Sequence, residues 1–262
     1  PLPDKHEGLK DQETIFRRRY LDLAVNPESR EMFKRKSKFW EINRKFLKEK
    51  GFLEVEIPVL EHVTGGADAK PFVTHHEALG ENFFLRISPE LYLKRLIGGG
   101  FEKVYSFGPN FRNEGISDEH LQEYYHIEWY WAYADYRDNM ALVKELFRYL
   151  AKEVYGKTDF VKGDHKFDLA DEWQEINYSK VIREKFSVDV FETPDEKILE
   201  ILRENQVNLP GAINRHRLVD NLWKLARKEV TGPAFLVEIP KFISPLAKSL
   251  PGDKKVTERF QP

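Results

Sequence analysis

The chain has 262 residues, of which 41% are hydrophobic and 33% are charged, so it is a globular chain long enough for one large domain or for one domain with an insertion. Lys and Arg (42) nearly balance Asp and Glu (44), which excludes a basic field over the whole protein and leaves only local patches for any nucleic-acid contact. The absence of cysteine excludes disulfides, thiolate catalysis and cysteine-ligated zinc.

No apolar stretch is long enough to span a bilayer, and the polar N-terminal segment lacks the apolar core of a signal peptide. We therefore expect a cytoplasmic protein without a membrane partner. Because the sequence begins at Pro1 and ends at Pro262, we also expect that both ends were cut from a longer chain.

The first fifty residues predict a linker followed by helix. Residues 1–13 are polar and predict the linker. Residues 14–23 place a basic run beside aromatic side chains, which is either a helix with a solvated arginine face or a contact for substrate or tRNA. Residues 27–50 carry apolar side chains at helical spacing, with Pro27 near the start and Gly51 just past the end, and they predict a long amphipathic helix.

The next segment predicts short strands and a loop. Residues 52–60 alternate between polar and apolar and then meet a proline, so they predict a strand whose ladder stops there. Residues 64–70, TGGADAK, predict a loop whose paired glycines either let the backbone approach a ligand closely or form a plain turn. Residues 83–87 predict a strand, and residues 89–96 a short helix.

The stretch 111–130 places an arginine, carboxylates, histidines and aromatic residues close together and predicts a nucleotide-binding hairpin. Residues 104–107, 111–113 and 124–133 are strand-like, and turn residues at 115–118 let the chain reverse. An arginine offers a planar fork of donors suited to phosphate or carboxylate. This stretch therefore suggests phosphate chemistry.

The rest of the chain predicts a second helical region. Residues 138–154 predict an amphipathic helix, residues 234–239 a short buried strand, and residues 244–255 a loop. The expected domain division is a linker at 1–13, a core at 14–154, a peripheral helical insertion at 155–230, and a return to the core at 231–262.

Polar residues of the hairpin leave two interpretations open. Arg112 stands beside Glu114 at a strand end, and the pair is either a structural ion pair or part of a phosphate site. Glu123 and Glu128 differ by five positions, so they face opposite sides of a regular strand. The side chains on the face of Glu128 either stack on a base or are half-buried packing: Tyr124, His126 and Tyr130.

Several familiar catalytic patterns are absent from the sequence. The histidines lack a convincing zinc-ligand spacing, no G-x-S-x-G nucleophile elbow occurs, and neither a Walker-type nor a dinucleotide-binding glycine pattern is present. A phosphate site must then depend on arginine, metal-bound phosphate and positioning, as adenylate formation does.

Motifs in a fixed order run through the chain. They are RRRYLDL at 17–23, GFLEVEIPVL at 51–60, TGGADAKPFVTHH at 64–76, the almost unbroken match at 85–117, ISPLAK at 243–248 and TERF at 257–260. In this order they resemble the catalytic domain of class II lysyl-tRNA synthetases.

The resemblance implies an α+β fold, with an antiparallel β-sheet flanked by helices and a helical insertion, and a homodimer through residues 27–58. It implies activation of lysine by ATP to lysyl-adenylate, followed by transfer of the lysyl group to the terminal ribose of tRNA(Lys), with Mg²⁺ bridging phosphates. Lysine, ATP and tRNA are the implied partners. No covalent enzyme intermediate is needed, which agrees with the lack of a nucleophile motif.

The resemblance also assigns roles to amino-acid-binding residues. Arg112 would be the catalytic residue, bridging the α-phosphate and the lysine carboxylate and neutralising charge in the transition state. The backbone of Gly66 and the side chain of Glu90 would receive the α-amino group. Glu128 and Tyr130 would lie along the side-chain end of the substrate.

The implied ATP contacts lie in the same hairpin. Besides Arg112, Glu114 would contact the adenine side and His120 would approach the outer phosphates. Tyr124 would stack on the adenine ring, where the family usually has phenylalanine.

The chain departs from the family pattern in two places. Residues 119–124 read EHLQEY where the family usually has Arg-His-Asn-Pro-Glu-Phe, so Glu119 replaces a cation near the γ-phosphate and is expected to weaken ATP binding. The sequence also ends before the family's third motif. We therefore expect the metal ligands beyond Pro262, and poor aminoacylation by this chain alone.

Other functions remain open from the sequence. A synthetase-like paralogue could bind nucleotide or a partner without charging tRNA. The sequence of residues 119–124 is closer to that of asparaginyl- and aspartyl-tRNA synthetases, so a ligase for asparagine or aspartate is a second alternative. A ligase for another acceptor, such as a protein lysine, is disfavoured by RRRYLDL, which belongs to the junction after an anticodon domain.

Overall fold

The computed structural model describes residues 8–115, 120–209 and 213–262, and the chain divides into two compact units, residues 1–134 and 135–262. Glu119 and most of the predicted turn at 115–118 lie outside the described residues. The unit boundary falls between Ala134 and Asp135, and the domain boundaries expected from the sequence stay predictions.

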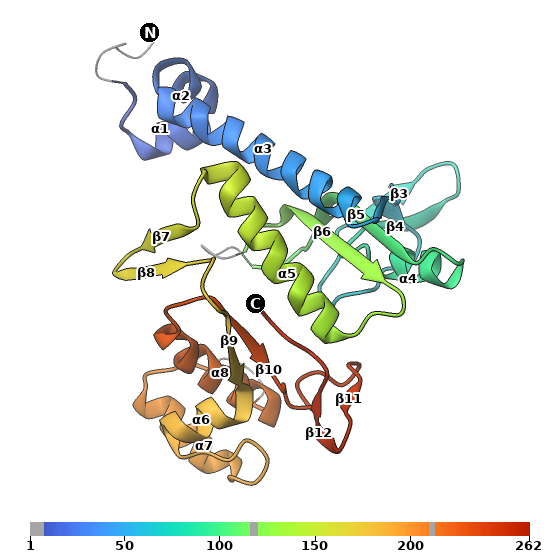
Figure 1. Cartoon of the computed structure of the whole chain (residues 1–262). Coiled ribbons are helices and arrows are strands. Elements are labelled where there is room, and N and C mark those ends of the chain that lie inside the picture. The colour runs from blue at the N-terminus through green and yellow to red at the C-terminus, as the bar shows by residue number, and fades with distance from the viewer. Residues whose placement is uncertain (1–7, 116–119, 210–212) are drawn as a thin grey trace. The chain divides into compact units, whose positions relative to one another are not determined.

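The first unit begins with the helices α1 (Gln12–Arg17), α2 (Arg19–Val25) and α3 (Pro27–Glu49), drawn in blue in Figure 1. The predicted long helix is therefore confirmed, with a proline in its first turn and Gly51 at a φ of 81° just past its end. Helix α1 starts at Gln12, inside the predicted linker. Only the C-terminal half of α3 is buried, whereas Met32 and Phe33 are 51% and 39% exposed.

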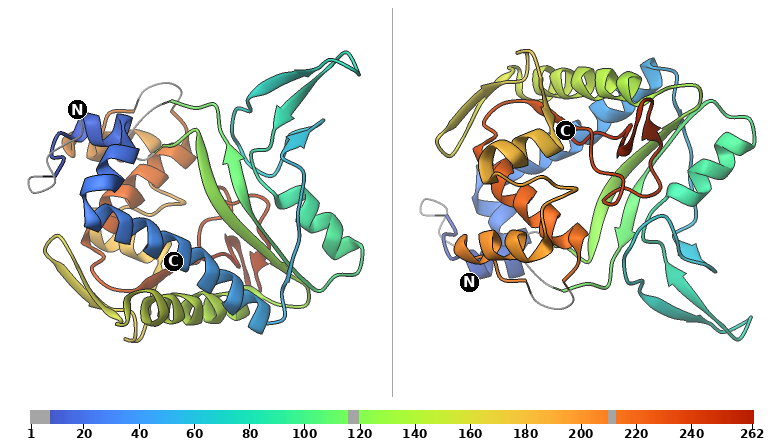
Figure 2. Two further views of the ribbon diagram at one scale, coloured as in Figure 1. Left: turned by 90° about the horizontal axis from the view of Figure 1, so that it is seen from above. Right: turned by 90° about the horizontal axis from the view of Figure 1, so that it is seen from below.

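The first sheet contains β1 (Leu53–Glu54), β5 (Lys103–Phe111) and β6 (Glu123–Trp131) in the order β1-β5-β6. Strand β1 is parallel to β5, and β5 is antiparallel to β6 along nine residue pairs, which Figure 2 shows as two long adjacent arrows. The break expected between residues 107 and 111 was wrong, because β5 runs through Pro109. Strand β1 pairs only with Val104 and Tyr105, so Pro109 lies where β5 has no second neighbour to receive an N–H.

The second sheet contains β2 (Leu60–Glu61), β4 (Glu81–Leu85) and β3 (Val73–His76) in the order β2-β4-β3, all antiparallel. Residues 52–60 do not form the single predicted strand. The N–H of Val55 still donates to Tyr105 O at 2.8 Å, but past Pro58 the carbonyl of Val59 accepts from Arg86 N at 2.8 Å. The chain therefore changes sheets at the proline. Helix α4 (Glu90–Gly98) follows β4, close to the predicted position.

Arg86 joins these parts of the first unit. Its side chain is only 3% exposed, and its guanidinium donates to Pro109 O at 2.9 Å and to Ile57 O at 3.1 Å. Its own carbonyl accepts from Phe111 N at 2.9 Å. A Cβ on Gly108 would lie 2.1 Å from the Nη2 of Arg86, so only glycine leaves room for the guanidinium against β5.

The second unit contains helices and short strands, in agreement with the predicted α+β class. The insertion expected to be helical at 155–230 also contains three strands, β7, β8 and β9. Each strand has four residues and is largely exposed, so its sequence shows no apolar pattern that would predict it. The elements are α5 (Tyr136–Leu150), the π-helix η1 (Ala151–Tyr155), β7 (Asp159–Lys162), β8 (His165–Asp168), β9 (Gln174–Asn177), α6 (Tyr178–Phe186), α7 (Asp195–Glu204), α8 (Arg215–Ala226), the 3₁₀ helix η2 (Arg227–Glu229), β10 (Ala234–Val237), β11 (Ser249–Leu250) and β12 (Asp253–Thr257).

Strands β9 and β10 pair in parallel, whereas β7–β8 and β11–β12 are antiparallel pairs. The helices α6, α7 and α8 supply most of a hydrophobic core that includes Tyr178, Ile182, Leu202 and Leu222. The buried strand predicted at 234–239 is confirmed as β10, since Phe235, Leu236 and Val237 are 3–4% exposed.

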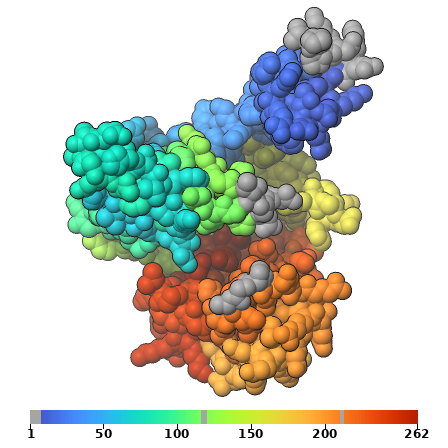
Figure 3. Space-filling model, turned by 180° about the vertical axis from the view of Figure 1, so that it is seen from behind, coloured from blue at the N-terminus to red at the C-terminus, as the bar shows by residue number. Residues whose placement is uncertain are grey.

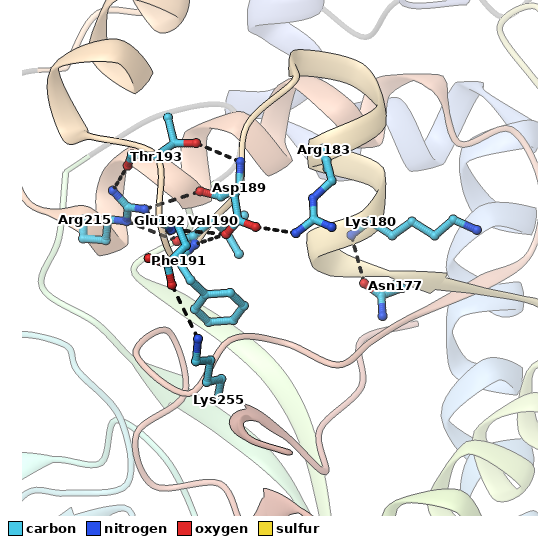
Figure 4. A network of polar contacts seen from close by, with 10 residues as sticks. All are labelled: Asn177, Lys180, Arg183, Asp189, Val190, Phe191, Glu192, Thr193, Arg215 and Lys255. Carbon is cyan, nitrogen blue, oxygen red and sulfur yellow. Dashed lines mark hydrogen bonds and ion pairs between the residues drawn. The ribbon is translucent and has the colours of Figure 1, made fainter. Parts of the chain in front are cut away.

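A polar network fixes the loop between α6 and α7 (Figure 4). The carboxylate of Asp189 accepts from the backbone N–H of Phe191 at 2.9 Å and of Glu192 at 3.2 Å, and it pairs with Arg183. Arg215 on α8 donates to Val190 O at 2.9 Å. These bonds satisfy loop carbonyls and amides that burial would otherwise leave unpaired.

Among the helices that the structure describes, none combines the length and the apolar character needed to cross a bilayer.

Glu61 on β2 is a buried carboxyl, 3% exposed, and its Oε2 has no hydrogen-bond partner among the described residues. Burial raises the pKa of Glu61 to about 7, and Arg86 and Arg95 oppose this shift only in part. A pKa raised in the folded state stabilises the fold below the ordinary value of 4.5, and this contribution disappears as the pH rises through about 7.

We therefore expect the free energy of unfolding to decline between about pH 4.5 and about pH 7. The Glu61→Gln variant should lack this decline and should be more stable than the wild type above pH 7 by on the order of 2 kcal/mol. Urea unfolding at a series of pH values measures both effects. The exposed Glu77→Gln on the β3–β4 hairpin is the matched control, and an unchanged decline in Glu61→Gln would contradict the assignment.

Candidate functional site

A row of polar and aromatic side chains lies on one face of β6, as the sequence predicted. Tyr124, His126, Glu128 and Tyr130 occupy alternate positions, which point to the same side of a strand. Their partners on β5 are Asn110, Gly108, Ser106 and Val104, in that order. The row is half-buried, with the side chains of His126 and Glu128 35% and 19% exposed, so a ligand can reach it.

The loop at 64–70 and helix α4 meet this row through Ser88. The hydroxyl of Ser88 donates to Glu128 Oε1 at 2.9 Å and accepts from the backbone N–H of Glu90 at 3.1 Å. Gly66 has a φ of 87°, and a Cβ there would lie 2.8 Å from Glu90 Cβ and 3.0 Å from Ser88 Oγ. The structure therefore brings together Gly66, Glu90 and Glu128, three of the predicted amino-acid-binding residues.

Glu90 and Glu128, here called the carboxylate pair, form the acidic end of the row. Burial first and the neighbouring charge of Glu90 second raise the pKa of Glu128, while the Ser88 hydrogen bond, Arg112 and Lys94 lower it. Burial and both carboxylates likewise raise the pKa of Tyr130. Lys94, one turn along α4, forms an ion pair with Glu90. An ammonium group is the ligand that such a pair favours.

Arg112 lies at the other end of the row, directly after β5. Its backbone N–H donates to Gln122 O at 2.9 Å, and its guanidinium carbon lies 5.5 Å from the centre of the Tyr124 ring. The Nε of Arg112 is buried and has no hydrogen-bond partner in the described part of the chain. A buried guanidinium donor left unpaired is suited to an anionic ligand.

Asn110 and His126 form a polar contact between the two ends. Asn110 is fully buried, and its Nδ2 lies 2.7 Å from His126 Nδ1. Burial, followed by the positive charges of Arg112 and Arg86, holds the pKa of His126 below its usual range. His126 is therefore a neutral imidazole at physiological pH, between a carboxylate and an arginine.

Glu114 and His120 stand apart from this cluster. Both are exposed, at the end of the hairpin beyond β5 and before β6. The negative charge of Glu114 contributes to raising the pKa of Tyr124, but burial and the charge of Glu128 contribute more. Their predicted roles as ATP contacts stay predictions.

Sequence reasoning missed Ser88, Asn110, Arg86 and Lys94 as parts of this site. The signal for Ser88 was present, because a serine two residues before a helix is a common partner of a free helical N–H. Asn110 and Arg86 gave no such signal, because their partners lie 16 and 23 residues away in the sequence.

The described residues include no cluster of three or more His, Asp or Glu side chains placed to hold a metal ion. No residue of the described chain is therefore assigned to Mg²⁺.

Comparison with known proteins gives the family. The family described as tRNA synthetases class II (D, K and N) matches residues 11–261. The chain belongs to this family. The membership confirms the recognition of a class II synthetase domain and its α+β fold class, made from the motifs between residues 17 and 260.

Within this family, the chain is similar to curated lysine–tRNA ligases. The chain is 47% identical to the lysine–tRNA ligase of Thermotoga maritima, 44% identical to that of Thermosipho africanus and 43% identical to that of Bacillus subtilis. Each match covers 100% of this chain but only 52% to 53% of the relative. The chain thus spans about half the length of the curated relatives it matches.

The position of Arg112 next to His126 can be tested by titration. Replacing Arg112 with methionine removes a cation but keeps most of the side-chain volume, so the pKa of His126 should rise toward its usual value. Proton–nitrogen NMR measures this pKa, with the His126 signal identified by its loss in His126→Asn. His165 on β8 in the second unit is the internal control, and an unchanged or lower pKa of His126 would contradict the geometry.

Proposed function

We propose that the chain is the part of a lysine–tRNA ligase that binds and activates lysine. The observation that carries the proposal is the order of charges along one face of β6 and its neighbours. The carboxylate pair lies at one end, the neutral His126 in the middle, and Arg112 with the Tyr124 ring at the other. Lysine and ATP together present ammonium groups, a carboxylate next to phosphate, and an aromatic base.

In the proposed first step, a carboxylate oxygen of lysine attacks the α-phosphorus of ATP. A phosphorus–oxygen bond to lysine forms, the bond to the β-phosphate oxygen breaks, and pyrophosphate leaves with the electron pair. Arg112 donates hydrogen bonds to the negative charge that grows between the two substrates. Gly66 and Glu90 receive the α-amino group, and Glu128 with Tyr130 holds the side-chain ammonium.

In the proposed second step, a hydroxyl of the terminal tRNA ribose attacks the lysyl carbonyl and AMP leaves. Tyr124 stacks on the adenine in both steps. The guanidinium carbon of Arg112 lies 5.5 Å from the centre of the Tyr124 ring and favours the position of this ring by a cation–π contact. Glu114 and His120 extend the proposed ATP contacts toward the exposed end of the hairpin. In this class of reaction Mg²⁺ neutralises charge on the phosphates. We propose a cytoplasmic location for the protein.

The carboxylate pair favours lysine over the other amino acids of the family. An aspartate side chain would bring a third carboxylate beside Glu90 and Glu128, and like charges at close range are unfavourable in a half-buried site. Asparagine has a neutral side chain and would add no positive charge beside Glu128, whereas Lys94 pairs with Glu90. The acidic end of the row thus supports lysine among the D, K and N members.

Lysine-dependent exchange of pyrophosphate into ATP tests the proposal. The measurement is made on this chain and on any longer natural form of the protein that contains it. Exchange with lysine, but not with asparagine or aspartate, is expected in the longer form, and this chain alone should exchange poorly. Exchange with asparagine or aspartate instead would overturn the specificity, and no exchange in the longer form would favour the paralogue that binds without charging.

Arg112 is the residue to change first. Arg112→Ala should lower exchange by at least about 100-fold, because it removes charge stabilisation at the reacting phosphate. Arg112→Lys should recover only part of this, since lysine lacks the planar fork. Arg203→Ala on the exposed side of α7 is the matched control. Wild-type exchange in Arg112→Ala would contradict its role.

The segment 27–58 is proposed to form a homodimer interface. Three apolar side chains of this segment are open to solvent, with Met32, Phe33 and Leu53 51%, 39% and 49% exposed. Helix α3, which carries Met32 and Phe33, belongs to the blue surface in Figure 3. Exposed apolar side chains gathered in one segment commonly mark an interface.

The mass of the chain in solution tests this interface. Light scattering after gel filtration should give a dimer at micromolar concentration, and Phe33→Glu should shift it to a monomer because the charge cannot be buried at an interface. Phe101→Glu, at a phenylalanine that is 45% exposed outside the segment, is the control and should stay dimeric. A monomeric wild type would contradict the proposal.

A further inference from the structure

Ser88 is a buried polar residue of this site that has no role in the proposed reaction steps. Its side chain is 3% exposed, and it lies between the end of β4 and the start of α4. It is the point at which three separate segments of the chain meet, because it touches Gly66, Glu90 and Glu128. A buried serine in this position either only fills space or orients a neighbouring side chain through its hydrogen bonds.

The hydrogen bonds of Ser88 fix the direction of its single proton. A serine hydroxyl has one proton to donate and lone pairs to accept with. Its oxygen accepts from the backbone N–H of Glu90 at 3.1 Å, so the proton is left for Glu128 Oε1 at 2.9 Å. The hydroxyl therefore acts as a donor to the carboxylate, with an orientation set by the first turn of α4.

This bond engages one oxygen of Glu128 and leaves the other for a ligand. The same Oε1 lies 3.5 Å from His126 Nδ1, so both neighbours lie on one side of the carboxylate. Gly66 packs against Ser88, since a Cβ at Gly66 would lie 3.0 Å from Ser88 Oγ. Both printed contacts of the carboxylate fall on Oε1, so Oε2 is the oxygen that can meet an incoming cation.

The hydrogen bond from Ser88 also affects the protonation of Glu128. Glu128 is half-buried beside a second carboxylate, Glu90, and burial and that neighbour both favour its protonated form. A protonated Glu128 cannot neutralise an ammonium group. Of the groups that oppose protonation, Ser88 is the first, before the charges of Arg112 and Lys94.

We propose that Ser88 is a positioning residue of the amino-acid site, whose hydroxyl orients the Glu128 carboxylate for the side-chain ammonium of the substrate. The inference rests on the proposed function, because it assigns the ammonium to Glu128. It adds a residue to that site and a reason for the loop at Gly66 to pack against it.

Ser88→Ala removes the donor without adding volume. Lysine affinity near pH 7 should fall about tenfold, the amount expected from losing one hydrogen bond to a charged group. Because the lost bond favours ionised Glu128, the pKa of Glu128 should rise, and the loss of lysine binding on acidification should begin at a higher pH. Calorimetric titration of the chain with lysine over a series of pH values measures both changes.

Two variants separate positioning from general damage to the fold. Ser88→Thr keeps the hydroxyl and should restore the affinity and the pH profile. Ser179→Ala, at a buried hydroxyl with no hydrogen-bond partner in the described chain, should leave both unchanged. Thermal unfolding of each variant shows whether it is folded at the temperature of the titration.

Carbon-13 NMR of the glutamate carboxyl carbons gives a readout that does not depend on lysine. The Glu128 signal is identified by its absence in Glu128→Gln. A higher pKa of Glu128 in Ser88→Ala supports the inference, and an unchanged pKa overturns it whatever the substrate is. If the pKa rises but the wild type binds no lysine at any pH, the hold on Glu128 stands and the proposed function fails instead.

Discussion

The buried guanidinium of Arg86 connects the two sheets of the first unit, and the geometry of the candidate site depends on it. It donates to Pro109 O at the end of β5 and to Ile57 O at the point where the chain passes from β1 to β2. Arg86 also precedes Ser88 by two residues, so the position of the Ser88 hydroxyl relative to β6 is set by the same contacts. Without the space above Gly108, the guanidinium could not lie against β5 and the segment leading into α4 would have no fixed place.

The site combines charges that would be unfavourable alone. Glu90 and Glu128 repel one another in a half-buried position, and Arg112 has a buried donor without a partner in the described chain. His126 stays neutral between them because burial and two arginines disfavour its protonation. A site with a preformed negative end and a preformed positive end gains binding energy from a zwitterionic ligand, because the ligand supplies the missing partner of each end.

The sequence was sufficient where local rules decide the structure. The spacing of apolar residues, Pro27 and Gly51 predicted α3, and the period of two placed Tyr124, His126, Glu128 and Tyr130 on one face. It failed where the outcome depends on which strand lies alongside. We expected separate strand segments at 104–107 and 111–113, but β5 continues through Pro109, because the neighbour on that side is the Arg86 segment and not a strand that needs an N–H from residue 109. Ser88 meets Glu128 from 40 residues away, and no local pattern encodes such a contact.

The way in which β5 ends also bears on how the protein behaves at high concentration. An unpaired strand edge is a template on which another copy can add a strand and begin aggregation. Along residues 109–111 this edge is already closed, because Pro109 has no N–H, its carbonyl is bonded to the Arg86 side chain, and the N–H of Phe111 is bonded to the Arg86 carbonyl. One arginine and one proline thus make the carbonyl of Pro109 and the N–H of Phe111 unavailable to the backbone of a second copy.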